Sequence, residues 1–266
     1  MDRAIVFTAQ QFLGFELCKG LLEKGFEVTA VEHKDMINNE CEDKWLEIGR
    51  NANLSYQLMN EKIELCEQTS ICFVPIYDLF VEKDEKLLNR WIGRFKEIYD
   101  ELKSNIKLIV LISPSQFLLN FSNRGDKIYY DMISDIFNIV RSRILEFYVP
   151  TIYGPWQPNS FLFQQIISRM GVRNYIDDCQ DAIYIEDAIQ TILQNIDKDL
   201  YEEKILLKSE KKDLWEKCIH FLNYADPFRN KDNQRQLNYT KLINVKENTS
   251  YEEGLKKQID CNRIRK

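Results

Sequence analysis

Short apolar runs that alternate with longer amphipathic stretches constrain the fold of this chain more than any other feature of its sequence. Apolar runs of roughly four to eight residues suit strands that are buried on both faces, as in a parallel sheet covered by helices. Five such runs lie at Ala4–Phe7, Val28–Val31, Ile71–Ile76, Ile106–Ile112 and Leu145–Ile152. Their alternation with helical patterns predicts an α/β fold built on a doubly wound parallel sheet.

The stretches between these runs place apolar residues at helical spacing. This pattern predicts helices at Phe12–Lys24, Glu85–Lys103 and Asp131–Arg143. After about residue 155 the alternation loosens. We therefore expect a core at residues 1–155 and a mixed C-terminal part at residues 156–266, in which a strand and a helix return to the core beside a small lobe.

Charge and cysteine content narrow the class of protein. A net charge of -6 gives no electrostatic reason to expect binding to nucleic acid or to anionic lipid. The seven cysteines form no Cys-x-x-Cys pair, which suits reduced thiols in a cytosol. No apolar stretch approaches the roughly 18 residues that a membrane span requires. These features predict a soluble, cytoplasmic protein with neither a nucleic-acid nor a membrane partner.

The turn after the first strand has the outline of a dinucleotide-binding unit. A G-x-x-G-x-x-G fingerprint would fall on Thr8, Gln11 and Gly14, so that only the third glycine is present. In such a turn the first glycine allows the bend, the second admits the pyrophosphate, and the third lets the helix pack on the strand. We expect Gln11 to place its side chain near the phosphate position. Backbone N–H groups at the helix start, at Phe12 and Leu13, still attract an anion weakly.

Glu32 ends the second strand, where an acid holds a ribose hydroxyl in a dinucleotide site. Taken alone, this residue is better interpreted as a solvated acid at the end of a strand. Together with Thr8, Gln11, Phe12 and Leu13, it makes up the candidate cofactor site. Because two of the three glycines are missing, we expect this site to hold either no nicotinamide cofactor or NAD(P) bound weakly.

Four later segments carry motifs of a known kind. They are IKLIVLISPSQFLLN at Ile106–Asn120, FYVPTIYGPWQP at Phe147–Pro158, DAIYIEDAIQTIL at Asp181–Leu193 and TSYEEGLKKQID at Thr249–Asp260. Together with the turn, they resemble the extended short-chain dehydrogenase/reductase family, the NAD-dependent epimerase/dehydratases that act on nucleotide sugars. The resemblance implies a Rossmann-type fold, a nucleotide or nucleotide-sugar ligand, and Ser115 at the catalytic serine or threonine position.

The catalytic motif of that family is altered in this chain. The family pairs a tyrosine with a lysine four residues on, which lowers the pKa of the tyrosine and anchors the nicotinamide ribose. Here Tyr129 is followed at that distance by Ile133, and Tyr130 by Ser134. Neither register supplies the cation. Ser115, Tyr129 and Tyr130 are therefore interpreted as vestigial positions in a degenerate member of the family.

The remaining candidates have simpler interpretations. The two histidines, His33 and His220, lie in no ligand-spaced cluster, so no metal site is expected. Tyr153 and Trp156 either line a pocket or form a packed aromatic turn. Three closely spaced carboxylates are interpreted as a solvated loop, namely Asp177, Asp178 and Asp181.

Three functions stay open for the sequence. The first is a pseudoenzyme that serves as a binding or regulatory module. The second is an active NAD(P)-dependent nucleotide-sugar epimerase, dehydratase or reductase with a rearranged site, and the third is a scaffold subunit that pairs with an active relative. We favour the first, because the phosphate turn and the Tyr–Lys pair are both altered.

The resemblance also implies an assembly. It suggests a homodimer or a heterodimer formed through the helices at residues 85–103 and 131–143, across a two-fold axis. Because aromatic anchors tend to dominate interfaces, we expect Trp91 or Phe95 near the centre of that contact.

Overall fold

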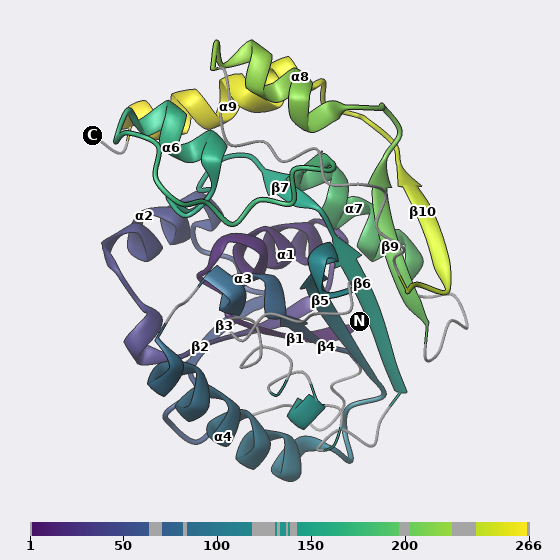
Figure 1. Ribbon diagram of the computed structural model, residues 1–266. Helices are drawn as coiled ribbons and strands as arrows, with labels where there is room; N and C mark the ends of the chain where they lie inside the picture. The colour runs from purple at the N-terminus through teal and green to yellow at the C-terminus, as the bar shows by residue number, and fades with distance from the viewer. Residues whose placement is uncertain are drawn as a thin grey trace. The chain divides into compact units, whose positions relative to one another are not determined.

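The computed structural model divides into two compact units (Figure 1). It describes residues 2–63, 71–81, 84–118, 131, 134–136, 138, 143–196, 203–224 and 238–264. Unit 1 comprises Met1–Ser113, Phe121–Glu146 and Ile196–Glu203. Unit 2 comprises Pro114–Asn120, Phe147–Asn195 and Lys204–Lys266.

Unit 1 contains the parallel strands that the apolar runs predict. Its elements are β1 (Arg3–Phe7), α1 (Phe12–Glu23), β2 (Glu27–Glu32), η1 (Lys34–Met36), α2 (Asn39–Ile48), β3 (Leu54–Leu58), β4 (Ile71–Pro75), α3 (Ile76–Val81), α4 (Glu85–Leu102) and β5 (Leu108–Pro114). The strands are parallel and lie in the order β3-β2-β1-β4-β5. The chain therefore winds outward in both directions from β1.

This strand order confirms the predicted fold class, a Rossmann-like α/β fold with a mostly parallel main sheet of eight strands. The sequence pattern also accounts for the central position of β1 and β5. Ala4–Phe7 and all seven residues of β5 are buried, because a central parallel strand is covered on both faces. The point where the winding reverses, between β1 and β4, is where α/β sheets hold their ligands, outside the carboxyl ends of the strands.

Unit 2 combines short strands with helices. Its elements are η2 (Ser115–Leu118), the end of β6 (Arg143–Val149), β7 (Thr151–Tyr153), α6 (Leu162–Ser168), β8 (Ala182–Tyr184), α7 (Ile185–Asn195), β9 (Lys204–Ser209), α8 (Leu214–Phe221), β10 (Lys241–Val245) and α9 (Tyr251–Ile264). Strand β7 pairs with β8, and β9 pairs with β10, each in parallel. Among the described helices of both units, none is long and apolar enough to cross a membrane.

A network of buried amides holds α9 in unit 2. The Gln258 side chain is 1% exposed and donates to the side-chain oxygens of Gln157 (2.8 Å) and Gln164 (2.9 Å). Its own oxygen accepts from the Gly154 N–H at 3.1 Å, and Gln164 donates in turn to Asn262 at 3.1 Å. These three hydrogen bonds of the Gln258 amide all end on buried partners, so the network fixes α9 against α6 and the turn after β7.

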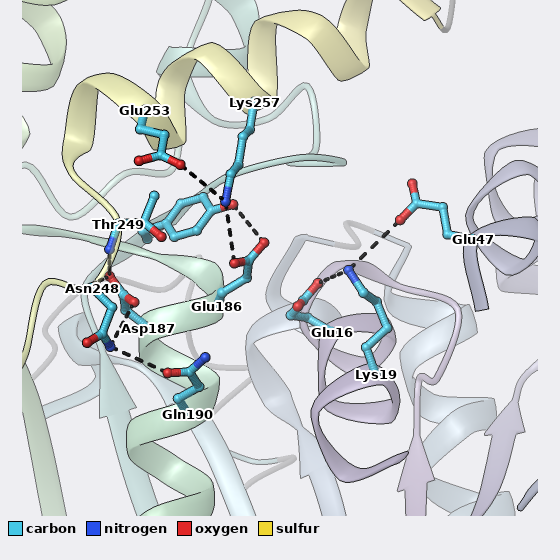
Figure 2. A network of polar contacts seen from close by, with 11 residues as sticks. Glu16, Lys19, Glu47, Glu186, Asp187, Gln190, Asn248, Thr249, Glu253 and Lys257 are labelled. Atoms are coloured by element: carbon cyan, nitrogen blue, oxygen red, sulfur yellow. Dashed lines mark hydrogen bonds and ion pairs between the residues drawn. The ribbon is translucent and has the colours of Figure 1, made fainter. Parts of the chain in front are cut away.

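Two aspartates of the D-x-I-Y segment act as clamps on backbone N–H groups. Asp181 is 6% exposed and accepts from the backbone N–H and the hydroxyl of Ser209, both at 2.7 Å. Asp187 accepts from the N–H groups of Asn248 (3.2 Å) and Thr249 (3.3 Å), as Figure 2 shows. The interpretation of Asp181 as part of a solvated loop is therefore wrong, because its carboxylate is buried and joins β8 to the end of β9.

Helix α4 in unit 1 buries the aromatic residues that were expected at an interface. Trp91 (0% exposed) and Phe95 (1% exposed) pack edge-on against Phe7, with ring centroids 6.0 and 5.1 Å away. Neither ring is available as the centre of a contact with another chain, contrary to the expectation from the sequence. The exposed positions of α4 are polar or glycine: Glu85, Lys86, Asn89, Arg90, Gly93, Lys96, Glu97, Asp100 and Glu101. The helix expected at residues 131–143 lies largely outside the described residues.

Candidate functional site

The candidate site in unit 1 is the turn that joins β1 to α1. Thr8 adopts φ 52°, a left-handed conformation that favours glycine and strains most other residues. The Gln11 N–H donates to the Thr8 carbonyl at 2.9 Å and closes the turn. The backbone thus keeps the bend of a dinucleotide turn, although threonine stands where the fingerprint has its first glycine.

Gly14 is required by the close approach of α1 to this turn. A Cβ atom on Gly14 would lie 2.0 Å from the Thr8 carbonyl oxygen and 3.1 Å from the Ala9 Cα atom. Both neighbours are backbone atoms, so they cannot move aside as a flexible side chain does. The third position of the fingerprint therefore keeps its packing role, as the sequence predicts.

Glu32 is part of the core of unit 1. The residue is 0% exposed, and its carboxylate accepts from the Gln10 N–H (2.9 Å), the His33 N–H (2.9 Å) and the Gln11 amide (3.3 Å). The interpretation of Glu32 as a solvated strand-end acid is therefore wrong. At the ribose position of a dinucleotide site, this carboxylate instead ties the turn to β2.

Gln10 is held from a second side by residues of α2 and β3. Its carbonyl oxygen accepts from the Lys44 ammonium group at 3.0 Å, and its side-chain oxygen accepts from the Tyr56 hydroxyl at 3.3 Å. The Gln11 side chain donates to Glu32 and to the Met36 carbonyl oxygen (3.1 Å), and it makes no capping bond to α1. The Gln11 side chain is therefore held by Glu32 and by the end of η1 and does not cap α1.

Asp78 of α3 accepts hydrogen bonds from the backbone amides at the start of α1, a contact that the sequence analysis did not predict. Its two carboxylate oxygens accept from the N–H groups of Leu13 (2.9 Å) and Gly14 (2.8 Å). The Thr8 hydroxyl lies 3.5 Å from the same carboxylate, and Asp78 is 4% exposed. The sequence held one signal for this contact, an acid shortly after the strand that pairs with β1.

Burial dominates the titration of both carboxyl groups at the turn. It raises the pKa of Glu32 to about 7, against the lowering effect of the bonds from Gln10, His33 and Gln11. Burial likewise raises the pKa of Asp78 to about 6, against the bonds from Leu13 and Gly14 and the charge of Lys44. Both groups therefore bind a proton more tightly in the folded chain than in the unfolded one.

This difference predicts how stability depends on pH. For a carboxyl group whose folded pKa is raised, the stabilisation is fully present below the unfolded pKa and is lost as pH rises through the folded pKa. For Glu32 the window runs from 4.5 to about 7. We expect its contribution to the free energy of unfolding to fall across that window by on the order of 1–3 kcal/mol. Urea denaturation at a series of pH values measures the fall.

The variant Glu32→Gln separates this contribution from the rest of the chain. It should show a shallower fall with pH than the unmodified protein, because a glutamine does not titrate. Glu42→Gln, at an exposed position of α2, is the matched control and should leave the profile unchanged. Equal slopes in Glu32→Gln and the unmodified protein would mean that the pKa of Glu32 is the same in the folded and unfolded chains, contrary to the shift expected from its burial.

Ser115, the expected catalytic serine, is engaged within unit 2. Its hydroxyl donates to the carboxylate of Asp178. Asp177 accepts from the Leu162 N–H (2.8 Å) and the Trp215 indole N–H (3.4 Å), and burial raises its pKa to about 7. Both aspartates lie in a loop, as expected, but they are half-buried and their carboxylates are engaged by these donors, so the interpretation as fully solvated acids is incomplete. The serine position thus has an internal carboxylate as its hydrogen-bond partner.

Of the other residues expected at a site, two are packed in the interior and two lie outside the described residues. Tyr153 and Trp156 are 1% and 8% exposed, which favours the packed aromatic turn over a pocket lining. Tyr129 and Tyr130 lie outside the described residues. Within the part of the chain that is described, no group of histidine, cysteine, aspartate and glutamate side chains is arranged to hold a metal ion.

Comparison with known proteins gives the fold its context. No family model and no curated protein matches the chain. Among solved structures, it is similar to UDP-glucuronic acid 4-epimerase from Bacillus cereus in complex with NAD, with a TM-score of 0.67 and 14% identity over 98% of this chain and 99% of the other. It is also similar to UDP-glucose 4-epimerase from Thermotoga maritima, with a TM-score of 0.62 and 15% identity over 99% of each chain.

A dehydratase is similar to the same degree. The dTDP-glucose 4,6-dehydratase from Bacillus anthracis, also in complex with NAD, gives a TM-score of 0.64 and 12% identity over 99% of this chain and 97% of the other. At these identities the likeness establishes the fold alone. The chain therefore has the fold of the NAD-dependent nucleotide-sugar epimerases and dehydratases.

Proposed function

We propose that this chain is a catalytically degenerate relative of the NAD-dependent epimerases and dehydratases, which acts as a binding or regulatory module and not as an oxidoreductase. The observation that carries the proposal is that the Glu32 carboxylate is buried and already hydrogen-bonded within the protein. Its carboxylate is bonded to Gln10, Gln11 and His33 and is fully buried, so that none of it faces solvent for a ribose hydroxyl. A cofactor bound in the manner of a dinucleotide turn would have to break these bonds.

The missing catalytic cation supports the same proposal. No lysine follows Tyr129 or Tyr130 at the spacing that the resembled family uses. In the resembled family that cation lowers the pKa of the tyrosine for proton exchange during hydride transfer, and this sequence supplies none at that spacing. The cofactor turn and the tyrosine positions are thus altered independently in the sequence, and either alteration alone would be expected to slow the chemistry.

An active enzyme with a rearranged site is the second candidate function. It is favoured by the likeness to epimerases whose structures contain NAD and UDP-glucuronic acid. In that case the nucleotide sugar and NAD would bind to this chain as well. A scaffold subunit that pairs with an active relative is compatible with the first candidate. The homodimer or heterodimer stays a prediction, and α4 would have to contribute polar residues to it.

Nicotinamide binding separates the two candidates. We expect the purified protein to carry no NAD(P) and to bind NADH more weakly than about 1 mM, as measured by NADH fluorescence and calorimetry. The reason is that Gln10 and Gln11 already satisfy Glu32. Micromolar binding of NADH, or a nicotinamide cofactor that co-purifies with the protein, would overturn the proposal and favour the active enzyme.

A double variant tests the turn itself. Thr8→Gly with Gln11→Gly relieves the left-handed strain at Thr8 and removes the amide that bonds to Glu32. We expect this variant to bind NADH better than the unmodified protein while it stays folded. A matched control is Gln57→Gly, outside the turn, which should leave nucleotide binding unchanged. An unaltered affinity in the double variant would place the block at another residue.

A further inference from the structure

The start of α1 has no cap of its own. Its N-cap residue, Gln11, makes no side-chain capping bond, and the first turn contains no acid. Helix α4 offers the contrast within the same unit, because its N-cap Asp84 accepts from the N–H groups of Lys86 and Leu87. The negative charge at the start of α1 comes instead from Asp78, 64 residues away from Gly14 along the chain.

Asp78 meets the helix as an anionic ligand would. Its two oxygens accept separately from consecutive N–H groups, those of Leu13 and Gly14, at 2.9 and 2.8 Å. Free N–H groups and the helix dipole make the N-terminus of a helix attractive to phosphate groups. A carboxylate in the same place satisfies these N–H groups and presents negative charge to any approaching anion.

The residues around Asp78 make the turn still less favourable for an approaching anion. Glu32 is also buried at this turn and interacts electrostatically with Asp78. Lys44 supplies a positive charge near Asp78, but its ammonium group donates to the Gln10 carbonyl oxygen. A pyrophosphate at this turn would therefore meet two carboxylates and one engaged lysine.

We propose that Asp78 is a built-in ligand of the α1 amides, which keeps phosphate-bearing molecules out of the turn. The site beneath it is an anion site that the chain fills with its own carboxylate. The inference rests on the proposed function and deepens it, because it names the residue that excludes the phosphate groups. The bonds of Glu32, by contrast, remove the acceptor for a ribose hydroxyl.

Removal of the carboxylate should expose the anion site. In Asp78→Ala the N–H groups of Leu13 and Gly14 lose their acceptor, and inorganic pyrophosphate can take its place. We expect pyrophosphate to bind this variant on the order of tenfold more tightly than it binds the unmodified protein. Pyrophosphate should also raise the melting temperature of the variant, at constant ionic strength set with chloride. Formate, which is close in size to the deleted group, should do the same at higher concentration.

Asp84→Ala is the matched control. It also removes a carboxylate from a helix N-terminus, but at an exposed cap, so neither pyrophosphate nor formate should stabilise it selectively. Asp78→Asn keeps the shape of the side chain and one acceptor, and it should gain pyrophosphate binding to a smaller extent than Asp78→Ala.

A folded Asp78→Ala without any response to pyrophosphate or formate would reduce Asp78 to a structural cap and overturn the inference. If Asp78→Ala does not fold, recovery of folded protein on refolding with pyrophosphate supports it. Failure of that recovery, together with a folded Asp78→Asn that does not respond, overturns it. Micromolar NADH binding by the unmodified protein would refute the proposed function and this inference together. An unresponsive, folded Asp78→Ala in a protein that binds NADH weakly refutes the inference alone, so the two failures are distinguishable.

Discussion

Replacement of Gly14 by alanine should destabilise the fold severely, by about 3 kcal/mol or more. The new methyl group would lie 2.0 Å from the Thr8 carbonyl oxygen, far inside van der Waals contact. Relief of this overlap requires α1 to move from the end of β1 or the left-handed turn at Thr8 to rearrange. Urea denaturation followed by circular dichroism measures the loss.

Gly93→Ala provides the control with the opposite sign. Gly93 lies inside α4, and a Cβ atom there would meet nothing within 4 Å. Alanine in an exposed helix should stabilise the chain by about 0.5–1 kcal/mol, because it reduces the freedom of the unfolded backbone. If Gly14→Ala were as stable as the unmodified protein, α1 would not approach the turn as closely as described, and the Rossmann-like geometry of this segment would be wrong.

Replacement of Gln258 by leucine should be the second severe change. The two side chains are similar in size, so the substitution mainly removes hydrogen bonds. It leaves three buried groups without their partner: the Gly154 N–H and the side-chain oxygens of Gln157 and Gln164. Because an unsatisfied buried polar group costs about 1–3 kcal/mol, we expect a loss of about 3 kcal/mol or more in the free energy of unfolding.

The same substitution at an exposed glutamine is the control for the loss of buried hydrogen bonds. Gln190 of α7 is exposed, and its one bond in this network is a long contact from Asn248 at 3.4 Å. Gln190→Leu should change the free energy of unfolding by less than about 0.5 kcal/mol. Similar losses in Gln258→Leu and Gln190→Leu would show that the buried amides do not act as a connected network.

The sequence predicts the parts of the fold that depend on local periodicity. The runs at Ala4–Phe7 and Val28–Val31 lie within β1 and β2, and the stretch at Phe12–Lys24 matches α1 to within one residue. These elements are central, so nearly every side chain in them must be apolar or follow a helical stripe. Strand β3 was missed because it has no apolar run: Ser55 and Tyr56 are exposed at the edge of the sheet.

The candidate site was harder to predict, because it depends on contacts between distant segments. From the sequence alone, the turn between β1 and α1 and its missing glycines could be located. It did not show that Glu32 is buried, since an acid at a strand end is usually solvated and the three donors to it come from the turn and its own neighbour. Nor did periodicity indicate Asp78, whose role depends on the pairing of β4 with β1.

The motif positions that the chain retains have structural roles in this protein. Besides Gly14, a Cβ atom on Gly154 would lie 2.6 Å from Ile185, and one on Gly254 would lie 2.7 Å from Tyr184. Asp181 and Asp187 clamp backbone N–H groups. A resemblance that rests on such positions therefore predicts architecture and carries little information about chemistry.

The capping of α1 by Asp78 also has a consequence for the order of folding. Most helices receive their cap from an adjacent residue, so that the first turn is stabilised as soon as the helix forms. The cap of α1 is instead Asp78, 65 residues beyond Leu13, and this side chain reaches the helix only after β4 has paired with β1. Closing so long a loop is slow and carries an entropic cost. We therefore expect the first βαβ segment to stay incomplete until α3 is available, with the start of α1 among the parts that become ordered late.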